Sequence, residues 1–458
     1  MKHLLPYLKK YRLEAVLAPL FKMLEACFDL TVPLIVAKII DVGIVGRDNS
    51  YIFTHFLLLI AMALLGLLCS FVAQYFAARA ATGTAMGLRR ELLARIQSFS
   101  FSELDRIGTS TLITRMTSDV NQVQNGANMF LRLFLRSPFI VFGAMILAFT
   151  IDSQIALIFV GAIVLLFAVV FGMMFLTAPK YKTVQKNLDA VRVIRAFGRE
   201  EQQTEQFAET NARLWRSQLH VGRWNALLNP LTYVIVNVGI VCILWMGADK
   251  VNRGVLLSGN VIALINYIGQ ILVELVKLAN LVVLLGKSAA GMGRIGQILD
   301  TESSMRFDGH ETGDDSAEEI LRFDHVSLLY AGAGAESISD ICFSVRRGQT
   351  VGIIGGTGSG KSSLVHLIPR FYDATSGCVT LKGKPIASLS REALLSSVAI
   401  VDQKPRLFTG TIAENLRWGK PDATEEELWQ ALETAQAAEF VRKKPDGLNE
   451  KITQGGAN

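Results

Sequence analysis

The sequence predicts a membrane α-helical domain of six spans, followed by an α/β domain. Of the 458 residues, 51% are hydrophobic and only 19% are charged, whereas soluble domains average about a quarter charged. The long apolar runs all precede residue 301, and the remainder has the composition of a soluble domain. We therefore expect a transmembrane domain over 1–300, a linker over 301–320 and a globular domain over 321–458.

Six stretches are candidates for membrane spans, because a helix needs about 20 apolar residues to cross the hydrocarbon core. Some meet this length only loosely, and the first is the least apolar. The stretches are 13–42, 51–78, 133–150, 155–176, 227–245 and 262–285.

The connections between these stretches predict the orientation. Segments 79–136 and 180–223 are long, basic and helical in periodicity, whereas the other three connections are short. Cytoplasmic loops carry the excess of Lys and Arg, so we expect both long loops, the N-terminus and the globular domain to be cytoplasmic. The chain would then be a multi-pass protein of the cytoplasmic membrane. This excess also explains the net charge of +6 without a nucleic-acid partner.

Three charged residues fall inside the predicted spans. Asp29 lies midway along the first, and Glu274 and Lys277 are three residues apart on the sixth, which places them on one helix face. One interpretation is that Glu274 and Lys277 neutralise each other while Asp29 faces a wet cavity. The other is that the three residues line a substrate pathway, since charges are costly within a membrane.

A phosphate-binding motif follows a β-branched run at 350–354, and a helical pattern at 363–368 follows the motif. The strand–loop–helix context is the one that G-x-x-x-x-G-K-[ST] requires. Glycines let backbone N–H groups turn toward phosphate oxygens, while the lysine reaches the β- and γ-phosphates and the serine hydroxyl holds Mg²⁺. The predicted ATP site comprises Gly355, Gly356, Thr357, Gly358, Ser359, Gly360, Lys361, Ser362 and Ser363.

With this motif in place, the chain resembles the ATP-binding cassette (ABC) exporters, in which six spans are fused to one cassette. Segment 323–330 is similar to the first cassette strand, which makes Tyr330 the aromatic residue that stacks on adenine. Segment 398–403 is similar to the strand that enters the glutamine loop, so the resemblance implies that Gln403 contacts Mg²⁺ with Ser362. Segment 407–416 resembles the stretch that follows in exporters.

Two departures from the family pattern stand out. The family's signature sequence, Walker B acid, catalytic glutamate and switch histidine have no match in these residues, so we assign no catalytic residue and expect a truncated cassette. In the second long loop, 184–190 runs directly into 191–197, so that about ten residues of the family pattern, nearly three helical turns, are missing between them in this chain. The first long loop resembles an intact docking segment over 102–108, with Arg115 and Asp119 following.

The resemblance implies ATP-driven export by alternating access, as one half of a homo- or heterodimer. The substrate would be a small molecule, lipid or peptide, most simply an amphipathic or hydrophobic one. The family is an ATPase-coupled one, but we expect this chain alone to bind Mg-ATP without hydrolysing it. The alternatives are a regulatory or gating membrane protein that binds nucleotide without turnover, and a soluble enzyme with a membrane anchor.

Overall fold

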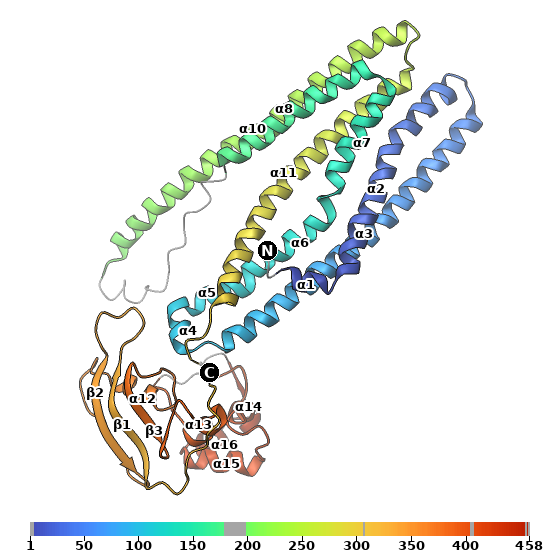
Figure 1. The fold of residues 1–458 in the computed structure, drawn as a ribbon. Coiled ribbons are helices and arrows are strands. Elements are labelled where there is room, and N and C mark those ends of the chain that lie inside the picture. Colours follow the sequence, from blue (N-terminus) through green and yellow to red (C-terminus); the bar gives the residue numbers. More distant parts are fainter. Residues whose placement is uncertain (1–3, 178–197, 306, 404–406, 454–455, 457–458) are drawn as a thin grey trace. The chain divides into compact units, whose positions relative to one another are not determined.

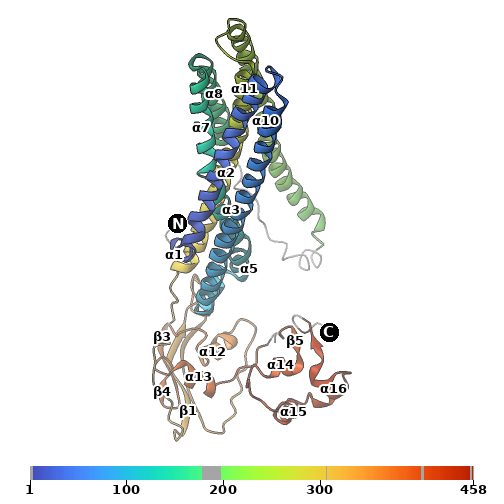
Figure 2. The same ribbon diagram turned by 90° about the vertical axis from the view of Figure 1, so that its right-hand side faces the viewer.

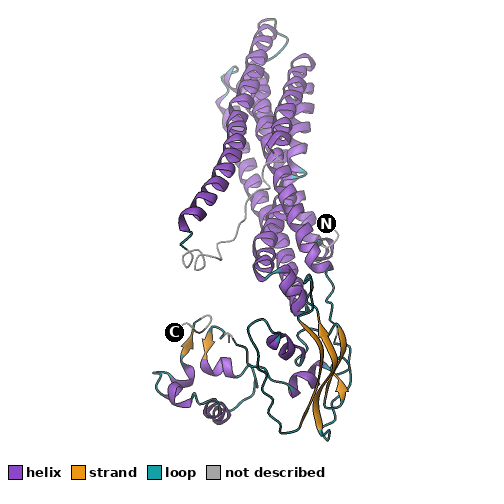
Figure 3. Ribbon diagram, turned by 90° about the vertical axis from the view of Figure 1, so that its left-hand side faces the viewer, coloured by secondary structure: helices purple, strands orange, loops and turns teal. Residues whose placement is uncertain are grey.

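The computed structural model describes residues 4–177, 198–305, 307–403, 407–453 and 456. The chain divides into two compact units, Met1–Ser304 and Met305–Asn458. The described elements of the first unit are all helices, and the strands belong to the second (Figure 3).

The first unit begins with the short helix α1 (Leu5–Lys9), after which long helices alternate with short connections. The long helices are α2 (Arg12–Lys38), α3 (Asn49–Gln97), α7 (Arg136–Ile151), α8 (Ser153–Thr177), α10 (Glu200–Asn252) and α11 (Ser258–Asp300). Shorter segments extend α2 or lead from α3 to α7, namely η1 (Ile39–Ile44), α4 (Phe101–Ile107), α5 (Thr109–Thr114), η2 (Arg115–Asp119) and α6 (Val120–Leu133).

All six predicted stretches lie in these helices, but they differ in apolar length. Among the described residues, four helical segments are long and apolar enough to cross a membrane, Asn49–Gln97, Thr109–Ile151, Pro230–Asn252 and Ser258–Asp300. The predicted first span falls short because Lys22, Glu25 and Asp29 interrupt α2. The predicted fourth is a shorter apolar helix over Ser153–Val169.

Helix α11 is central to the first unit and contacts α2, α6, α7, α8 and α10. Helices α8 and α10 run side by side, and α2 pairs with α3 (Figure 1). Tyr267 of α11 is fully buried in the largest apolar cluster, and its hydroxyl donates to the backbone oxygen of Leu30 on α2 at 2.8 Å. The interior of the unit is therefore organised around one face of α11.

The second unit contains a four-stranded antiparallel sheet in the order β2-β1-β3-β4. Its strands are β1 (Glu319–Leu328), β2 (Ile338–Arg346), β3 (Ser376–Leu381) and β4 (Lys384–Pro385). Phe323 of β1 is buried and stacks on Phe343 of β2 with ring centroids 4.6 Å apart. Helices α12 (Lys361–Leu367) and α13 (Arg391–Ser397) lie beside this sheet and share its apolar core (Figure 2).

A smaller group of elements follows and has an apolar cluster of its own. Two short strands pair antiparallel, and capping boxes begin two of the helices, at Thr411 with Glu414 and at Thr424 with Glu427. The elements are β5 (Gly410–Thr411), α14 (Ile412–Leu416), α15 (Glu425–Thr434), α16 (Ala438–Arg442), η4 (Gly447–Asn449) and β6 (Lys451–Ile452).

Two predicted strands, 350–354 and 398–402, are wrong in this structure, since both segments are irregular. A strand is stable only when neighbours complete its hydrogen-bond ladder, and no strand among the described residues pairs with either segment. Ile354 and Val401 are consequently 97% and 93% exposed. Both segments have the apolar pattern of a buried strand, but neither pairs with a neighbouring strand among the described residues.

Candidate functional site

The phosphate-binding motif forms a loop that ends at the first residue of α12. Gly358 and Gly360 have φ angles of 85° and 83°, a region that glycine enters at little cost. Gly360 is the N-cap of α12, which begins at Lys361. Because the first N–H groups of a helix have no intrahelical acceptor, those of Lys361, Ser362 and Ser363 are available to a ligand.

The side chain of Lys361 lies against this loop. Its Nζ donates to the backbone oxygen of Gly355 at 2.9 Å, to that of Gly356 at 2.5 Å and to Oγ of Ser359 at 3.3 Å. The ammonium group thus rests on neutral oxygens, which attract it less strongly than phosphate oxygens do. The lysine is positioned where a phosphate would be bound, by contacts that a phosphate can replace.

The shape of the loop also fits a phosphate group. A Cβ atom built on Gly360 would lie 2.5 Å from Ile338 Cγ2 and 2.6 Å from the backbone oxygen of Ser337, so only glycine fits there. Open space surrounds Gly356 and Gly358, with nothing within 4 Å of a Cβ built on either residue. Thr357, Ser359 and Ser362 are exposed. Backbone, lysine and hydroxyl groups therefore converge on an open surface, as nucleotide phosphates and Mg²⁺ require.

Tyr330 lies beside this loop. Its hydroxyl donates to Oγ of Ser363 at 3.0 Å, and its ring meets that of Tyr372 edge-on with centroids 4.9 Å apart. The ring is partly exposed. The structure therefore brings Tyr330 together with the phosphate loop, although 33 positions separate it from Ser363.

Gln403 is not brought to the loop. It is exposed, and within the described ranges no hydrogen bond joins it to residues 355–363. The irregular segment 398–402 explains this, since a strand there would have fixed the direction in which the chain leaves it. The pairing of Gln403 with Ser362 around Mg²⁺ remains a prediction.

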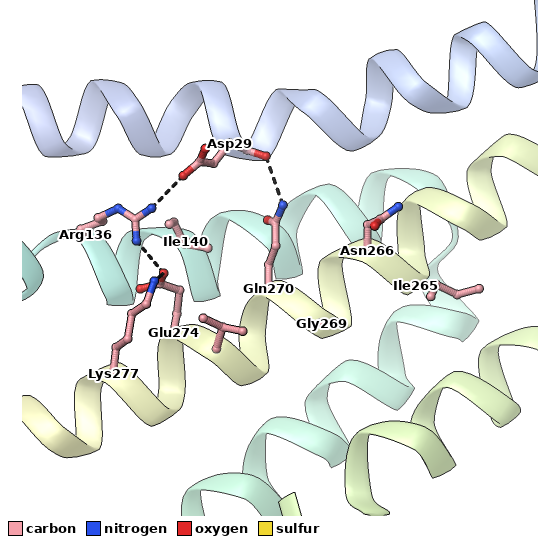
Figure 4. Close-up of a pocket in the computed structure, with 10 residues that line it drawn as sticks. Asp29, Arg136, Ile140, Ile265, Asn266, Gly269, Gln270, Glu274 and Lys277 are labelled. Atoms are coloured by element: carbon pink, nitrogen blue, oxygen red, sulfur yellow. Dashed lines mark hydrogen bonds and ion pairs between the residues drawn. The ribbon is translucent and has the colours of Figure 1, made fainter. Parts of the chain in front are cut away.

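The second polar site lies among α2, α7 and α11 of the helical unit (Figure 4). Arg136 of α7 donates through Nη1 to Oε1 of Glu274 at 2.5 Å and through Nη2 to Oδ2 of Asp29 at 2.7 Å. Lys277 donates to the same Oε1 at 2.8 Å, and the hydroxyl of Ser137 donates to Oε2 at 2.7 Å. Arg136 and Glu274 are 9% and 3% exposed. The four charged side chains of this group line a cavity of about 440 Å³.

The sequence predicted the pairing of Glu274 with Lys277 but not the arginine that joins them to Asp29. By sequence Arg136 is the last residue of the basic segment 79–136. The available signal was its place three residues into an apolar run, since an arginine there faces either the protein interior or the membrane surface. The packing of α7 between α2 and α11 places Arg136 in the protein interior, which the sequence alone does not show.

Further polar contacts join the predicted docking segment to its surroundings. The side chain of Glu103 accepts from the backbone N–H of Ser100 at 3.1 Å and from the hydroxyl of Ser100, which also lies 3.1 Å from that of Ser304. Burial raises the pKa of Glu103, but hydrogen bonds from Ser100 and Ser304 outweigh it and hold the pKa below its usual value. The shortened stretch at 184–197 of the second long loop lies outside the described residues.

Comparison with known proteins gives matches to both units. A family model described as the ABC transporter transmembrane region matches residues 16–275, and one described as ABC transporter matches residues 338–456. The chain is 31% identical to the uncharacterized ABC transporter ATP-binding protein YfiB of Bacillus subtilis (strain 168), over all of this chain and 82% of YfiB. It is 30% identical to the similarly named Rv1273c of Mycobacterium tuberculosis (strain H37Rv), over 99% of this chain and 80% of the relative.

Proposed function

Because this chain belongs to the ABC transporter family, with a transmembrane region and an ATP-binding domain in one polypeptide, we propose that it is one half of a dimeric, ATP-driven exporter. The observation that carries this proposal is the phosphate loop, in which Lys361 lies over the carbonyl oxygens of Gly355 and Gly356. A chain with this loop and membrane helices can couple nucleotide binding to movement of those helices.

Different residues of the loop and its surroundings bind different parts of Mg-ATP. Backbone N–H groups at the start of α12 bind phosphate oxygens, and Lys361 leaves its carbonyl contacts to reach the β- and γ-phosphates. Tyr330 offers its ring to adenine. Ser362 and Gln403 would hold Mg²⁺, which neutralises phosphate charge when bound.

Transport requires a second half-transporter, identical to this chain or different from it. Two membrane regions would enclose one pathway within the lipid bilayer, and two cassettes would hold ATP between them. Binding of ATP favours one arrangement of the helices and its release the other, which alternates access to the pathway. We place the N-terminus and the ATP-binding domain in the cytoplasm, because both long loops are basic.

Residues 1–458 contain groups that bind nucleotide but no match to the groups that position water. Catalysis needs interactions that are stronger in the transition state than in the ground state. We therefore propose that this chain by itself holds Mg-ATP without hydrolysing it.

Nucleotide binding is tested with a fluorescent ATP analogue on the purified chain in detergent. We expect binding to the wild type and its loss in Lys361→Ala, whereas Lys384→Ala, a surface lysine paired with Glu311, should bind normally. Equal binding by all three chains would contradict the proposed site. ATPase activity of this chain that disappears in Lys361→Ala would contradict the absence of hydrolysis.

Export is tested with inside-out membrane vesicles that contain the chain together with a half-transporter partner. We expect ATP-dependent uptake of a short-chain fluorescent phosphocholine amphiphile, which carries no net charge, and its loss when this chain carries Lys361→Ala. ATP-gated flux without ATP consumption would instead favour the regulatory alternative. Uptake that is the same with and without Lys361 would show that this chain does not drive export.

A further inference from the structure

The cavity among α2, α7 and α11 has a charged side and an apolar side. Asp29, Arg136, Glu274 and Lys277 form the charged side, while Ile140, Ile265 and Val273 contribute aliphatic groups. Figure 4 shows the charged side chains pointing toward one another from the three helices. Cavities of this size that combine apolar walls with a few polar groups are typical of small-molecule sites.

The charged groups differ in how fully their hydrogen bonds are used. Glu274 accepts three hydrogen bonds, from Arg136 and Lys277 to one oxygen and from Ser137 to the other. Its role is to hold the helices together. The side chains of Asp29 and Lys277, in contrast, are 45% and 42% exposed. Each makes one hydrogen bond with its charged group among the described residues, so each can bind a further partner.

Two buried polar atoms at the cavity lack any partner in the part of the chain that the structure describes. They are Nε of Arg136 and Oε1 of Gln270. The amide nitrogen of Gln270 donates to the backbone oxygen of Asp29 at 3.2 Å, which directs its free oxygen away from that bond. Burying polar atoms without hydrogen bonds is costly. The protein itself therefore leaves one buried donor and one buried acceptor of the residues that line this cavity without a hydrogen bond.

The ion pairs around the cavity sum to zero charge. Three basic residues, Lys22, Arg136 and Lys277, are joined to three acidic ones, Glu25, Asp29 and Glu274. A ligand of net charge would therefore enter a neutral site in a low-dielectric region, and its desolvation would not be compensated. A ligand with one positive and one negative group adds no net charge and can satisfy both Asp29 and Lys277.

We propose that this cavity binds a zwitterionic amphiphile, whose cationic group pairs with Asp29 and whose anionic group pairs with Lys277. The aliphatic side chains of Ile140, Ile265 and Val273 would contact its hydrocarbon part. This inference rests on the proposed export function, because it assigns the chemical class of the transported substrate. Arg136 and Glu274 are positioning residues here, since the network that they form places Asp29 and Lys277.

The test uses three photoactivatable probes that share an eight-carbon tail with a terminal diazirine and differ only in the head group. The heads are phosphocholine, trimethylammonium and methyl phosphate, so that the last two carry one charge each. The full chain is labelled in uncharged maltoside micelles without ATP, and mass spectrometry locates the labelled residues. We expect the phosphocholine probe to label residues 265–277 about tenfold more than either singly charged probe does, since its second charge adds one ion pair and a partly exposed ion pair is worth roughly that factor.

Two isosteric variants separate the two charges. Asp29→Asn should reduce phosphocholine labelling about tenfold and should not reduce methyl phosphate labelling, because the variant site carries a net positive charge. Lys277→Met should likewise reduce phosphocholine labelling about tenfold and should not reduce trimethylammonium labelling, because its site carries a net negative charge. Asp249→Asn and Lys10→Met, at exposed positions outside the cavity, are the matched controls. Val273→Trp fills the cavity without altering charge and should reduce labelling by all three probes, which tests the site even if a charge variant does not fold.

Equal labelling by the three probes, stronger labelling by a singly charged probe, or labelling that neither Asp29→Asn nor Lys277→Met changes would overturn the proposal. These outcomes are independent of nucleotide, so a failure here leaves ATP-driven export by another substrate intact. Failure of the export function itself would appear as ATP-independent uptake with unchanged probe labelling.

Discussion

Arg136 of α7 donates to Glu274 of α11 at 2.5 Å, although 138 positions separate them in the sequence. Both side chains are buried. Removing one member of a buried ion pair leaves a charge without compensation, which costs far more than the pair itself contributes. Removal of either partner should therefore strongly destabilise the packing of α7 against α11.

We expect Arg136→Met to lower the free energy of unfolding of the helical unit by about 3 kcal/mol, because Asp29 and Glu274 then face each other without a cation between them. Thermal unfolding of the full chain in nanodiscs measures this. The double variant Arg136→Met with Glu274→Met should recover part of the loss, since an apolar pair replaces the buried ion pair at little cost, although Asp29 and Lys277 each lose a partner.

Arg253→Met is the control, because Arg253 forms an exposed pair with Asp249 four residues earlier on α10. Such a pair contributes about 0.5 kcal/mol or less. If Arg136→Met and Arg253→Met destabilised the chain equally, the buried ion pairs around Glu274 would contribute no more to stability than an exposed pair does.

The sequence predicts those parts of the molecule that depend on nearby residues. The motif ending at Lys361 and Ser362 predicts a loop followed by a helix, and α12 begins at Lys361. Segment 350–354 has the apolar pattern of a strand but forms none, because pairing depends on residues far along the chain. Arg136 was missed for the same reason, since its partners lie on two other helices. Spacing cannot show that a guanidinium bridges them.

The capping interactions of Glu103 predict a pH dependence. Its pKa in the folded chain lies below the ordinary value of 4.5, so the carboxylate stabilises the fold fully above pH 4.5 and loses this contribution as the pH falls through the lowered pKa. At pH 7 we expect Glu103→Gln to cost about 1 kcal/mol, as hydrogen bonds to a charged group do.

Thermal unfolding of both chains between pH 7 and pH 3 is the measurement for Glu103. The difference between wild type and Glu103→Gln should shrink as the pH falls below 4.5. A difference that stays constant over this range would mean that the charge of Glu103 contributes nothing. Glu209→Gln, at an exposed position, should match the wild type throughout.

Two replacements of Tyr330 distinguish the contribution of its ring to ATP binding from that of its hydroxyl. Tyr330→Phe keeps the ring and loses only the hydrogen bond to Ser363, so we expect affinity for the ATP analogue within about twofold of wild type, less than one full hydrogen bond. Tyr330→Ala removes the stacking surface and should weaken binding about tenfold. Equal affinities for the two variants would show that the ring does not contact adenine.

The predicted orientation is tested by labelling single cysteines in intact cells, after the five native cysteines are replaced by serine. Ser153 is the first residue of α8 and Ser110 lies in α5, and both are exposed. An impermeant maleimide should label Ser153→Cys but not Ser110→Cys, which should react only after permeabilisation. Labelling of Ser110→Cys but not of Ser153→Cys in intact cells would show that the chain has the opposite orientation in the membrane.

Two glycines of the phosphate loop provide a matched pair. Gly360 combines a φ of 83° with a site where a Cβ would lie 2.5 Å from Ile338, so Gly360→Ala adds strain and a clash together. We expect it to abolish binding of the ATP analogue and to lower the stability of the second unit by about 2 kcal/mol. Gly356 has open space around its Cα and no positive φ, so Gly356→Ala should leave stability unchanged. If ATP lies over this face of the loop, the added methyl group should still weaken binding, whereas full affinity in Gly356→Ala would place the phosphates elsewhere.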